Sequence, residues 1–269
     1  MSYHEPFENR TIAISISESP DMPALGLSKQ HLLDAMAEVA RHMLALGARL
    51  AYGGDLRAGG FSEFLFELVA RHRPDVDEQS GTGIYSYLAW PVHMGMEPQE
   101  VETAKADLAG VAELICLDLD GAVIPMDVRA TQGKYAATPV EWARGLTSMR
   151  RTMQQATDAR VLLGGAVAGY RGAMPGIAEE ADLTLQAKQP IYLLGGFGGC
   201  ARDIAETIGI APKWPGSRGD WPGRSTFQNV NHADFNNGLT PDELELLART
   251  PHVDQAVILV MRGLRDVWK

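Results

Sequence analysis

The sequence has few cysteines, and neither of them belongs to a pattern that binds a metal. Cys116 and Cys200 are the two cysteines in 269 residues, which excludes a disulfide framework and indicates a reducing compartment. Neither lies in a Cys/His cluster with the spacing of zinc ligands. We therefore expect no metal site and no bound cofactor.

Basic residues and long apolar runs are also scarce. Lys and Arg number 24 against 34 Asp and Glu, and the net charge is -10. Proteins that bind nucleic acid usually present a basic surface, so we expect no nucleic-acid partner. Residues 1–10 are polar and lack the apolar core of a signal peptide, and no apolar run is long enough to span a bilayer. We expect a cytoplasmic protein with no membrane partner.

Glycine, in contrast, is abundant, with 28 residues, and much of it follows short apolar runs. Three such runs end in glycine pairs, at Gly53-Gly54, Gly164-Gly165 and Gly195-Gly196. Ligands of parallel α/β sheets bind beyond the carboxyl ends of the strands, where glycine lets the backbone approach them. The alternative is that these glycines only form tight turns between strands and helices.

Apolar periodicity and turn residues predict a doubly wound α/β protein with a mainly parallel sheet and helices on both faces. We expect strands at 11–17, 48–52, 84–90, 113–117, 161–163, 191–194 and 256–260. We expect helices at 28–46, from 61 or 62 onward, at 98–109 and 141–157, between 165 and 191, after 199 to 208, and at 240–248. The chain reads as a single domain over 1–269, with an irregular surface loop near 212–238 that could be a lid or a partner surface.

Polar residues follow the first two predicted strands. Ser17 and Ser19 come at the end of the first strand, where their hydroxyls could donate to a phosphate or only cap turns. Asp55 and Arg57 lie within the glycine turn after the second strand. Arg can form two parallel hydrogen bonds to a phosphate, which favours a ligand contact, although an Asp–Arg pair could simply stiffen the turn.

A second group of charged residues flanks the strand at 161–163. Arg150 and Arg151 lie near the end of the predicted helix at 141–157, and one of them could reach a phosphate while the other meets solvent. Glu179 and Glu180 fall in the first turns of the next helix, where acidic residues are also favourable for purely structural reasons.

Other residues carry weaker indications of function. Asp118 and Asp120 could bind a metal, but two acids with this spacing are not specific. His93 could face a cleft or serve in packing, and its pKa cannot be read from sequence. Tyr170 or Phe197 could stack on a base, or pack in the core.

The order of the predicted strands, glycine turns and charged residues resembles that of the SLOG superfamily. This Rossmann-like group includes the lonely-guy phosphoribohydrolases and the DNA-processing protein DprA. The lonely-guy enzymes carry an arginine on a helix, then a strand and a P-G-G-x-G-T-x-x-E loop that starts the next helix. The resemblance places Arg150 or Arg151 at that arginine and aligns the acidic end of the motif with residues 176–180. It implies that Glu180 is the catalytic acid and Glu179 its neighbour.

The sequence departs from this enzyme motif. No proline precedes Gly164-Gly165, the insertion 166–175 separates the glycines from the acids, and Ile177 stands at the threonine position. The sequence is more similar to prokaryotic SLOG domains of antiviral defence and signalling systems, which carry G-G-D-x-R after the second strand and G-x-x-P-G-x-x-E-E later. Such domains occur fused to TIR or SIR2 modules, which implies binding of a product of NAD cleavage.

The resemblance implies one of two functions. The first is a sensor or effector domain that binds a nucleotide-derived molecule, such as an ADP-ribose-like or NAD-derived signal, with a TIR- or SIR2-type partner protein. The alternative is a lonely-guy-like N-glycosidase that acts on a nucleoside monophosphate or an NAD-like substrate, with Glu180 and Arg150 as catalytic residues. In either case we expect a homo-oligomer. The candidate ligand-binding residues are Ser17, Gly53, Gly54, Asp55, Arg57, Arg150, Arg151, Gly164, Gly165, Gly176, Glu179, Glu180, Gly195 and Gly196.

Overall fold

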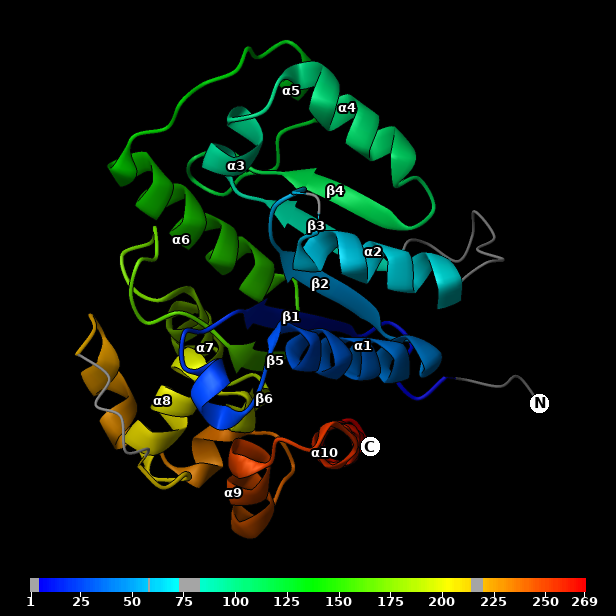
Figure 1. Cartoon of the computed structure of the whole chain (residues 1–269). Coiled ribbons are helices and arrows are strands. Elements are labelled where there is room, and N and C mark those ends of the chain that lie inside the picture. The colour runs from blue at the N-terminus through cyan, green and yellow to red at the C-terminus, as the bar shows by residue number, and fades with distance from the viewer. Residues whose placement is uncertain (1–4, 58, 73–82, 214–219) are drawn as a thin grey trace.

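A parallel sheet of six strands forms the centre of the computed structural model, which describes residues 5–57, 59–72, 83–213 and 220–269 (Figure 1). The strands lie in the order β4-β3-β2-β1-β5-β6, and each neighbouring pair is parallel. The predicted α/β class with a mainly parallel sheet is confirmed. The strands are β1 (Thr11–Ser17), β2 (Arg49–Gly53), β3 (Ile84–Leu88), β4 (Ala112–Cys116), β5 (Ala159–Gly164) and β6 (Ile191–Leu194).

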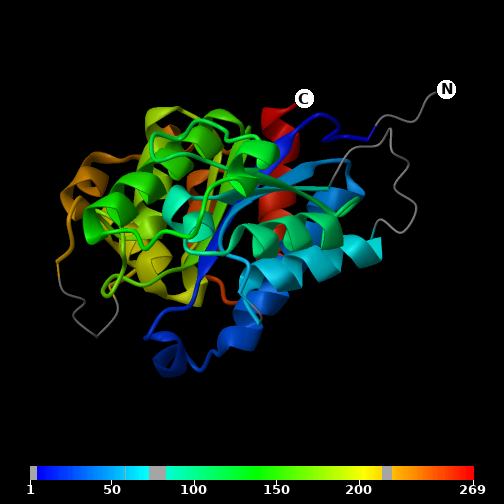
Figure 2. The same cartoon turned by 90° about the horizontal axis from the view of Figure 1, so that it is seen from above.

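Helices cover both faces of this sheet (Figures 1 and 2). Alternate residues of β1 point to opposite faces, so that Ile12 and Ile14 join the core beneath α1 while Ala13 joins the core beneath α6. One face carries α1 (Lys29–Ala45), α2 (Phe61–His72) and α10 (Val253–Val267), and the other carries α6 (Pro139–Gln155), α7 (Gly176–Gln186) and α8 (Gly199–Ile208). The other helices are α3 (Trp90–Met94), α4 (Pro98–Asp107), α5 (Met126–Ala130) and α9 (Pro241–Arg249).

Several helix ends follow from local sequence. Ser28 is the N-cap of α1, as predicted, and Gly47 comes two residues after its last turn with φ +87°. Thr240 caps α9, its hydroxyl accepting a hydrogen bond from the Glu243 N–H, and Pro241 follows at the first helical position. These short-range patterns explain why most predicted boundaries agree with the structure to within a few residues.

The strand order reverses at β1, which pairs with β2 on one side and with β5 on the other. From β1 the sheet grows outward to β4, and the chain then crosses back to β5 on the opposite side. The segments that leave neighbouring strands at such a point diverge, and a crevice opens between them at the carboxyl edge of the sheet. The fold therefore places a cleft beyond Ser17 and Gly53.

The strand predicted at 256–260 is wrong, because this segment lies within α10. Ala256, Val260 and Leu264 are buried at four-residue spacing and pack in the core cluster that contains α1. The short apolar run at 256–260 is compatible with a strand, but the apolar spacing continues to Leu264 and is typical of a helix. No helix in the described ranges, α10 included, combines the length and apolarity needed to cross a membrane.

The segment predicted as an irregular surface loop, 212–238, is anchored to the protein body where the structure describes it; residues 214–219 lie outside the described residues. Trp221, Phe227 and Phe235 are almost fully buried and pack with α8. The Trp221 indole N–H donates to the Asp203 carboxylate, to which Arg224 also donates, at 2.8 Å. The prediction of a surface loop is therefore wrong for these three aromatic residues. The turn residues around them keep the segment irregular, but burial of the aromatic rings holds it against α8.

His93 lies inside the protein, away from the cleft. The predicted third strand ends at Leu88, and α3 follows with Pro91 in its first turn. His93 is 0% exposed; its Nε2 donates to the Leu117 carbonyl at 2.7 Å and its Nδ1 accepts from the Arg129 Nε at 2.9 Å. Burial lowers the pKa of His93 to about 4, so the imidazole is neutral at pH 7.

We expect acid to destabilise the protein through His93. The unfolded chain takes up this proton near pH 6.5, whereas the folded protein does so only near pH 4. The contribution of neutral His93 to the free energy of unfolding is therefore complete above the unfolded pKa and is lost as the pH falls toward 4. The expected loss of stability is on the order of 2–3 kcal/mol. Urea unfolding at pH 7 and pH 4.5 measures it. His93→Gln keeps one donor and one acceptor and should show a smaller pH dependence; an identical dependence in both proteins would contradict this account.

Candidate functional site

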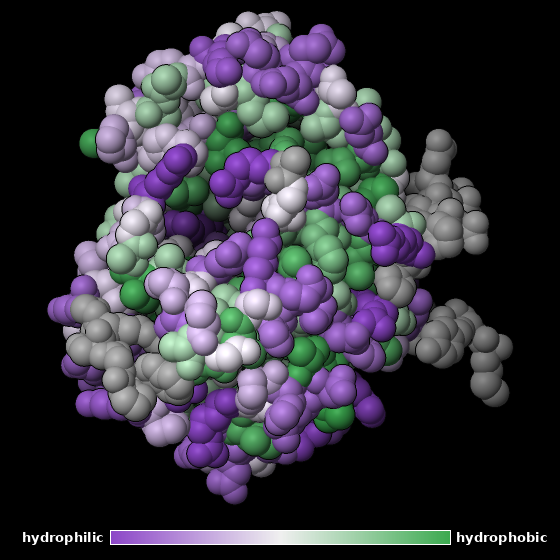
Figure 3. Space-filling view, viewed as in Figure 1, coloured by the Kyte–Doolittle hydropathy of each residue, from purple (hydrophilic) through white to green (hydrophobic). Residues whose placement is uncertain are grey.

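A cleft of about 940 Å³ opens at the carboxyl edge of the sheet, over the ends of β1 and β2. Its walls come from the β1 end, the turn between β2 and α2, α3, α6, the loop before α7, and α7 itself. The space-filling view in Figure 3 shows a hollow on this face, with hydrophilic and hydrophobic residues side by side at its rim. The cleft thus lies where the reversal of strand order leaves room for a ligand.

The predicted ligand-binding residues divide into two equal groups. Seven of them line this cleft: Ser17, Gly53, Gly54, Asp55, Arg57, Arg150 and Glu180. The other seven are not among its lining residues: Arg151, Gly164, Gly165, Gly176, Glu179, Gly195 and Gly196. Their assignment as ligand-binding residues stays a prediction, but the structure shows which of them lie together.

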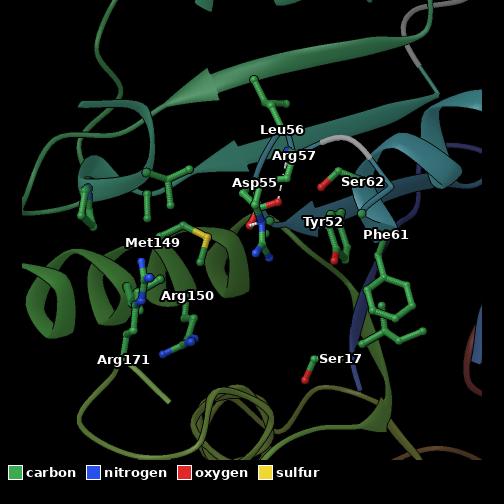
Figure 4. A pocket seen from close by; sticks show the side chains of 18 of the residues that line it. Ser17, Tyr52, Asp55, Leu56, Arg57, Phe61, Ser62, Met149, Arg150 and Arg171 are labelled. Atoms are coloured by element: carbon green, nitrogen blue, oxygen red, sulfur yellow. Dashed lines mark hydrogen bonds and ion pairs between the residues drawn. The ribbon is translucent and has the colours of Figure 1, made fainter. Parts of the chain in front are cut away.

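The structure resolves which of the two adjacent arginines faces the cleft. Arg150 is 8% exposed and lines the cleft, whereas Arg151 is exposed. Successive residues of a helix point about 100° apart, so one of two neighbours is directed away when the other faces inward. In Figure 4 the Arg150 side chain extends from α6 toward the open space.

Arg150 belongs to a buried charge cluster with Arg160, Glu179 and Glu180. Its guanidinium donates to the Glu179 carboxylate, and its Nε lies 3.7 Å from an oxygen of Glu180. Arg160, only 1% exposed near the start of β5, places an Nη atom 3.4 Å from the other Glu180 oxygen. Two guanidinium groups thus flank the buried Glu180 carboxylate at the wall of the cleft.

Two donors of this cluster have no hydrogen-bond partner among the described residues. They are the Nε of Arg150 and one Nη of Arg160. Burial lowers the pKa of the Arg160 guanidinium, and the Glu180 carboxylate opposes that shift. A buried donor without a partner is costly, and Arg150 lines the cleft, where an anionic ligand could accept from it.

Asp55 and Arg57 form an ion pair at the rim of the cleft. The Arg57 Nε lies 2.6 Å from an Asp55 carboxylate oxygen, and the Arg57 side chain is 82% exposed. Both predicted roles therefore fit the geometry, because the pair stiffens the turn and also borders the cleft. The two glycines before it make room: a Cβ at Gly53 would lie 2.7 Å from the Met149 sulfur, and one at Gly54 would lie 2.3 Å from a Tyr52 ring carbon.

Further cleft residues did not emerge from the sequence. Arg171, labelled in Figure 4, lies in the insertion before α7 and lines the cleft. Its guanidinium stacks over the Trp142 ring, 4.4 Å from the ring centroid. On the α2 side, Lys29 and Tyr52 line the cleft near Ser62. The sequence indicates Arg171 as a ligand-binding residue only by its place in the glycine-rich insertion 166–175. Tyr52 ends an apolar strand, and its neighbours in sequence do not distinguish it from a core residue.

The glycine turn after β6 lies against the chain that follows α9. Gly195 and Gly196 are buried, and a Cβ at Gly196 would lie 1.9 Å from the Thr250 carbonyl oxygen. At the start of α8, the Gly199 N–H donates to both carboxylate oxygens of Asp21, at 3.0 and 3.1 Å. The Asp21 carboxylate thus takes the place that an anionic ligand could have at the N-terminus of α8.

The weaker candidates lie elsewhere. Phe197 is fully buried, and Tyr170 is not among the cleft-lining residues. Asp118 accepts hydrogen bonds from the N–H groups of Asp120 and Ala122, which explains it as a turn residue. No group of three or more His, Cys, Asp or Glu side chains able to hold a metal occurs among the described residues.

The parallel sheet, its order and the cleft at the reversal point define a Rossmann-like α/β protein. The chain belongs to the SLOG family: the family model described as SLOG cluster2 matches residues 6–248. Membership indicates a nucleotide-related Rossmann-like domain. No curated protein matches the chain.

We expect Gly196→Ala to lower stability strongly, because its Cβ would overlap the Thr250 carbonyl. Overpacking against backbone costs about 2–3 kcal/mol. Gly133→Ala is the matched control, since its Cβ meets nothing within 4 Å. Urea unfolding of both variants checks this; a Gly196→Ala protein as stable as Gly133→Ala would show that Gly196 has another role.

Proposed function

We propose that the cleft binds a nucleotide-derived small molecule, such as an ADP-ribose-like or NAD-derived signal. One observation carries this proposal: a protein with net charge -10 gathers Lys29, Arg57, Arg150 and Arg171 around a single cleft at the reversal point of its sheet. Glu18, Asp55 and Glu180 also line the cleft, so the proposal rests on the guanidinium and ammonium donors that the four basic residues offer to phosphate oxygens.

The cleft offers complementary surfaces to the parts of such a ligand. Arg150 and Arg171 supply guanidinium donors that match phosphate oxygens. The Glu180 carboxylate accepts hydrogen bonds from ribose hydroxyls. An apolar wall, suited to the face of a base, is formed by Pro91, Val92, Leu146 and Met149.

Within a cell, the proposed role is that of a sensor or effector domain in a prokaryotic defence or signalling system. Family membership and the cleft support a nucleotide-related role. The identity of the signal, a TIR- or SIR2-type partner protein that generates it, and assembly into a homo-oligomer are further parts of this proposal. The signal and the partner rest on the resemblance drawn from G-G-D-x-R at residues 53–57 and from the acidic pair Glu179-Glu180. The homo-oligomer rests on the common self-association of Rossmann-like surfaces.

Calorimetric titration with ADP-ribose, cyclic ADP-ribose, NAD and AMP tests the proposal. We expect at least one of them to bind, and Arg171→Ala to weaken it roughly tenfold because a charged hydrogen bond to phosphate is lost. Arg171 is exposed, so the folded protein should tolerate this change.

Arg249→Ala is the matched control for this experiment. Arg249 lies on α9, outside the cleft lining, and its side chain is half-exposed beside Glu245. It removes the same charge and should leave affinity unchanged. If the unaltered protein binds none of the four compounds, the proposal is refuted. If both variants weaken binding equally, the effect of Arg171→Ala comes from the change in net charge and not from a contact with the ligand.

The alternative is hydrolysis of an N-glycosidic bond, and the environment of Glu180 favours considering it. An ionised carboxylate in the cleft can stabilise an oxocarbenium-like ribosyl centre or activate water. Water would then bond to the anomeric carbon while the carbon–nitrogen bond breaks. The proton lost by water goes to the leaving nitrogen of a base such as adenine, or to solvent when neutral nicotinamide leaves. Glu180 is 7% exposed between Arg150 and Arg160 and still lines the cleft.

If the protein is such an enzyme, Glu180→Gln should slow release of base from AMP or NAD by roughly a hundredfold or more. Glu179→Gln is the matched control, because Glu179 belongs to the same charge cluster but is not among the cleft-lining residues. It should reduce stability and leave base release per folded molecule nearly unchanged. Chromatographic assay of released base, with thermal unfolding of each variant, measures both; equal rates for Glu180→Gln and the unaltered enzyme would exclude this role.

A further inference from the structure

Tyr52 places a buried phenol at the edge of the cleft. It lies near the end of β2, is 6% exposed and lines the cleft. In Figure 4 its oxygen points toward the open space on the side of Ser17. Among the described residues, no hydrogen bond is formed by this hydroxyl, although buried tyrosines usually find a partner.

A second buried tyrosine shows the ordinary arrangement. Tyr192, in β6 and 0% exposed, donates its hydroxyl to the Asn237 carbonyl at 2.9 Å. That bond ties the segment before α9 to the sheet. The two residues thus share chemistry and burial, but the described protein uses only one of the two hydroxyls for its own structure.

The Tyr52 ring is held in place by close packing. A Cβ at Gly54 would lie 2.3 Å from a Tyr52 ring carbon and 2.7 Å from the Ser62 hydroxyl oxygen. Any side chain at Gly54 would therefore displace the ring or Ser62. The absence of a side chain at Gly54 therefore leaves room for the Tyr52 ring at the edge of the cleft.

The surroundings make the Tyr52 hydroxyl a donor. Burial, and then the nearby carboxylates of Asp55 and Glu180, raise the pKa of Tyr52, so its proton stays in place throughout the physiological range. The same two carboxylates accept hydrogen bonds from hydroxyl groups and repel phosphate. This part of the cleft therefore suits a neutral, hydroxyl-bearing part of a ligand, while Arg150 and Arg171 suit its phosphates.

We propose that Tyr52 is a ligand-positioning residue that donates a hydrogen bond to a hydroxyl group of the ligand's ribose, so that the cleft selects ribose over deoxyribose. This inference rests on the proposed function and specifies the sugar that the cleft takes. It requires no covalent step. It holds for a sensor and for an N-glycosidase alike.

The test compares the unaltered protein with Tyr52→Phe by calorimetric titration. The probes are ADP-ribose, AMP, 2′-deoxy-AMP and 3′-deoxy-AMP. We expect Tyr52→Phe to weaken binding of ADP-ribose and AMP roughly three- to tenfold through loss of one hydrogen bond. The deoxy compound that lacks the contacted hydroxyl should bind both proteins equally, because the change in protein and the change in ligand remove the same interaction.

Tyr192→Phe is the matched control, measured together with thermal unfolding. It should bind the probes like the unaltered protein and unfold more readily, while Tyr52→Phe should unfold at an unchanged temperature. The inference is overturned if Tyr52→Phe binds AMP and ADP-ribose as tightly as the unaltered protein, if it weakens all four probes alike, or if it destabilises as much as Tyr192→Phe. If the unaltered protein binds none of the probes, the proposed function itself fails, and this inference with it.

Discussion

The buried charge cluster of Arg150, Arg160, Glu179 and Glu180 joins three elements that the rest of the site depends on. Arg160 comes from the start of β5, Arg150 from α6, and the two acids from the first turns of α7. A buried charge left without its partner costs about 3–5 kcal/mol, so these groups hold one another in position. The cluster thereby fixes the wall of the cleft from which Arg150 and Glu180 face a ligand.

The strand ends of this sheet use glycine for different physical purposes. Gly53 and Gly54 leave space for Met149 and Tyr52, and both also line the cleft. The pair after β6 instead allows the segment after α9 to approach the sheet closely. Asp21 occupies the N-terminus of α8, and so the open part of the carboxyl edge lies over β1 and β2.

Much of the fold could be predicted, because strands, helix caps and turns depend on residues close in the sequence. The strand prediction at 256–260 was wrong because a five-residue apolar run fits a strand as well as a buried helix face. Only part of the candidate site could be predicted in this way, since seven of the fourteen predicted ligand-binding residues line the cleft. Which of Arg150 and Arg151 faces inward depends on the rotation of α6 against the sheet, and Arg171 reaches the cleft only because its loop folds back over Trp142.

By itself, the sequence determined the α/β class, the mainly parallel sheet and the ends of several helices such as α1 and α9, since apolar periodicity and capping residues act over a few positions. Tertiary structure decided which charges meet. The Arg160 guanidinium binds the Ser15 hydroxyl across 145 residues at 2.8 Å, and Glu180 lies between two arginines from separate elements. Such pairings depend on how the helices pack on the sheet, and no local pattern encodes the distance between two side chains brought together by that packing.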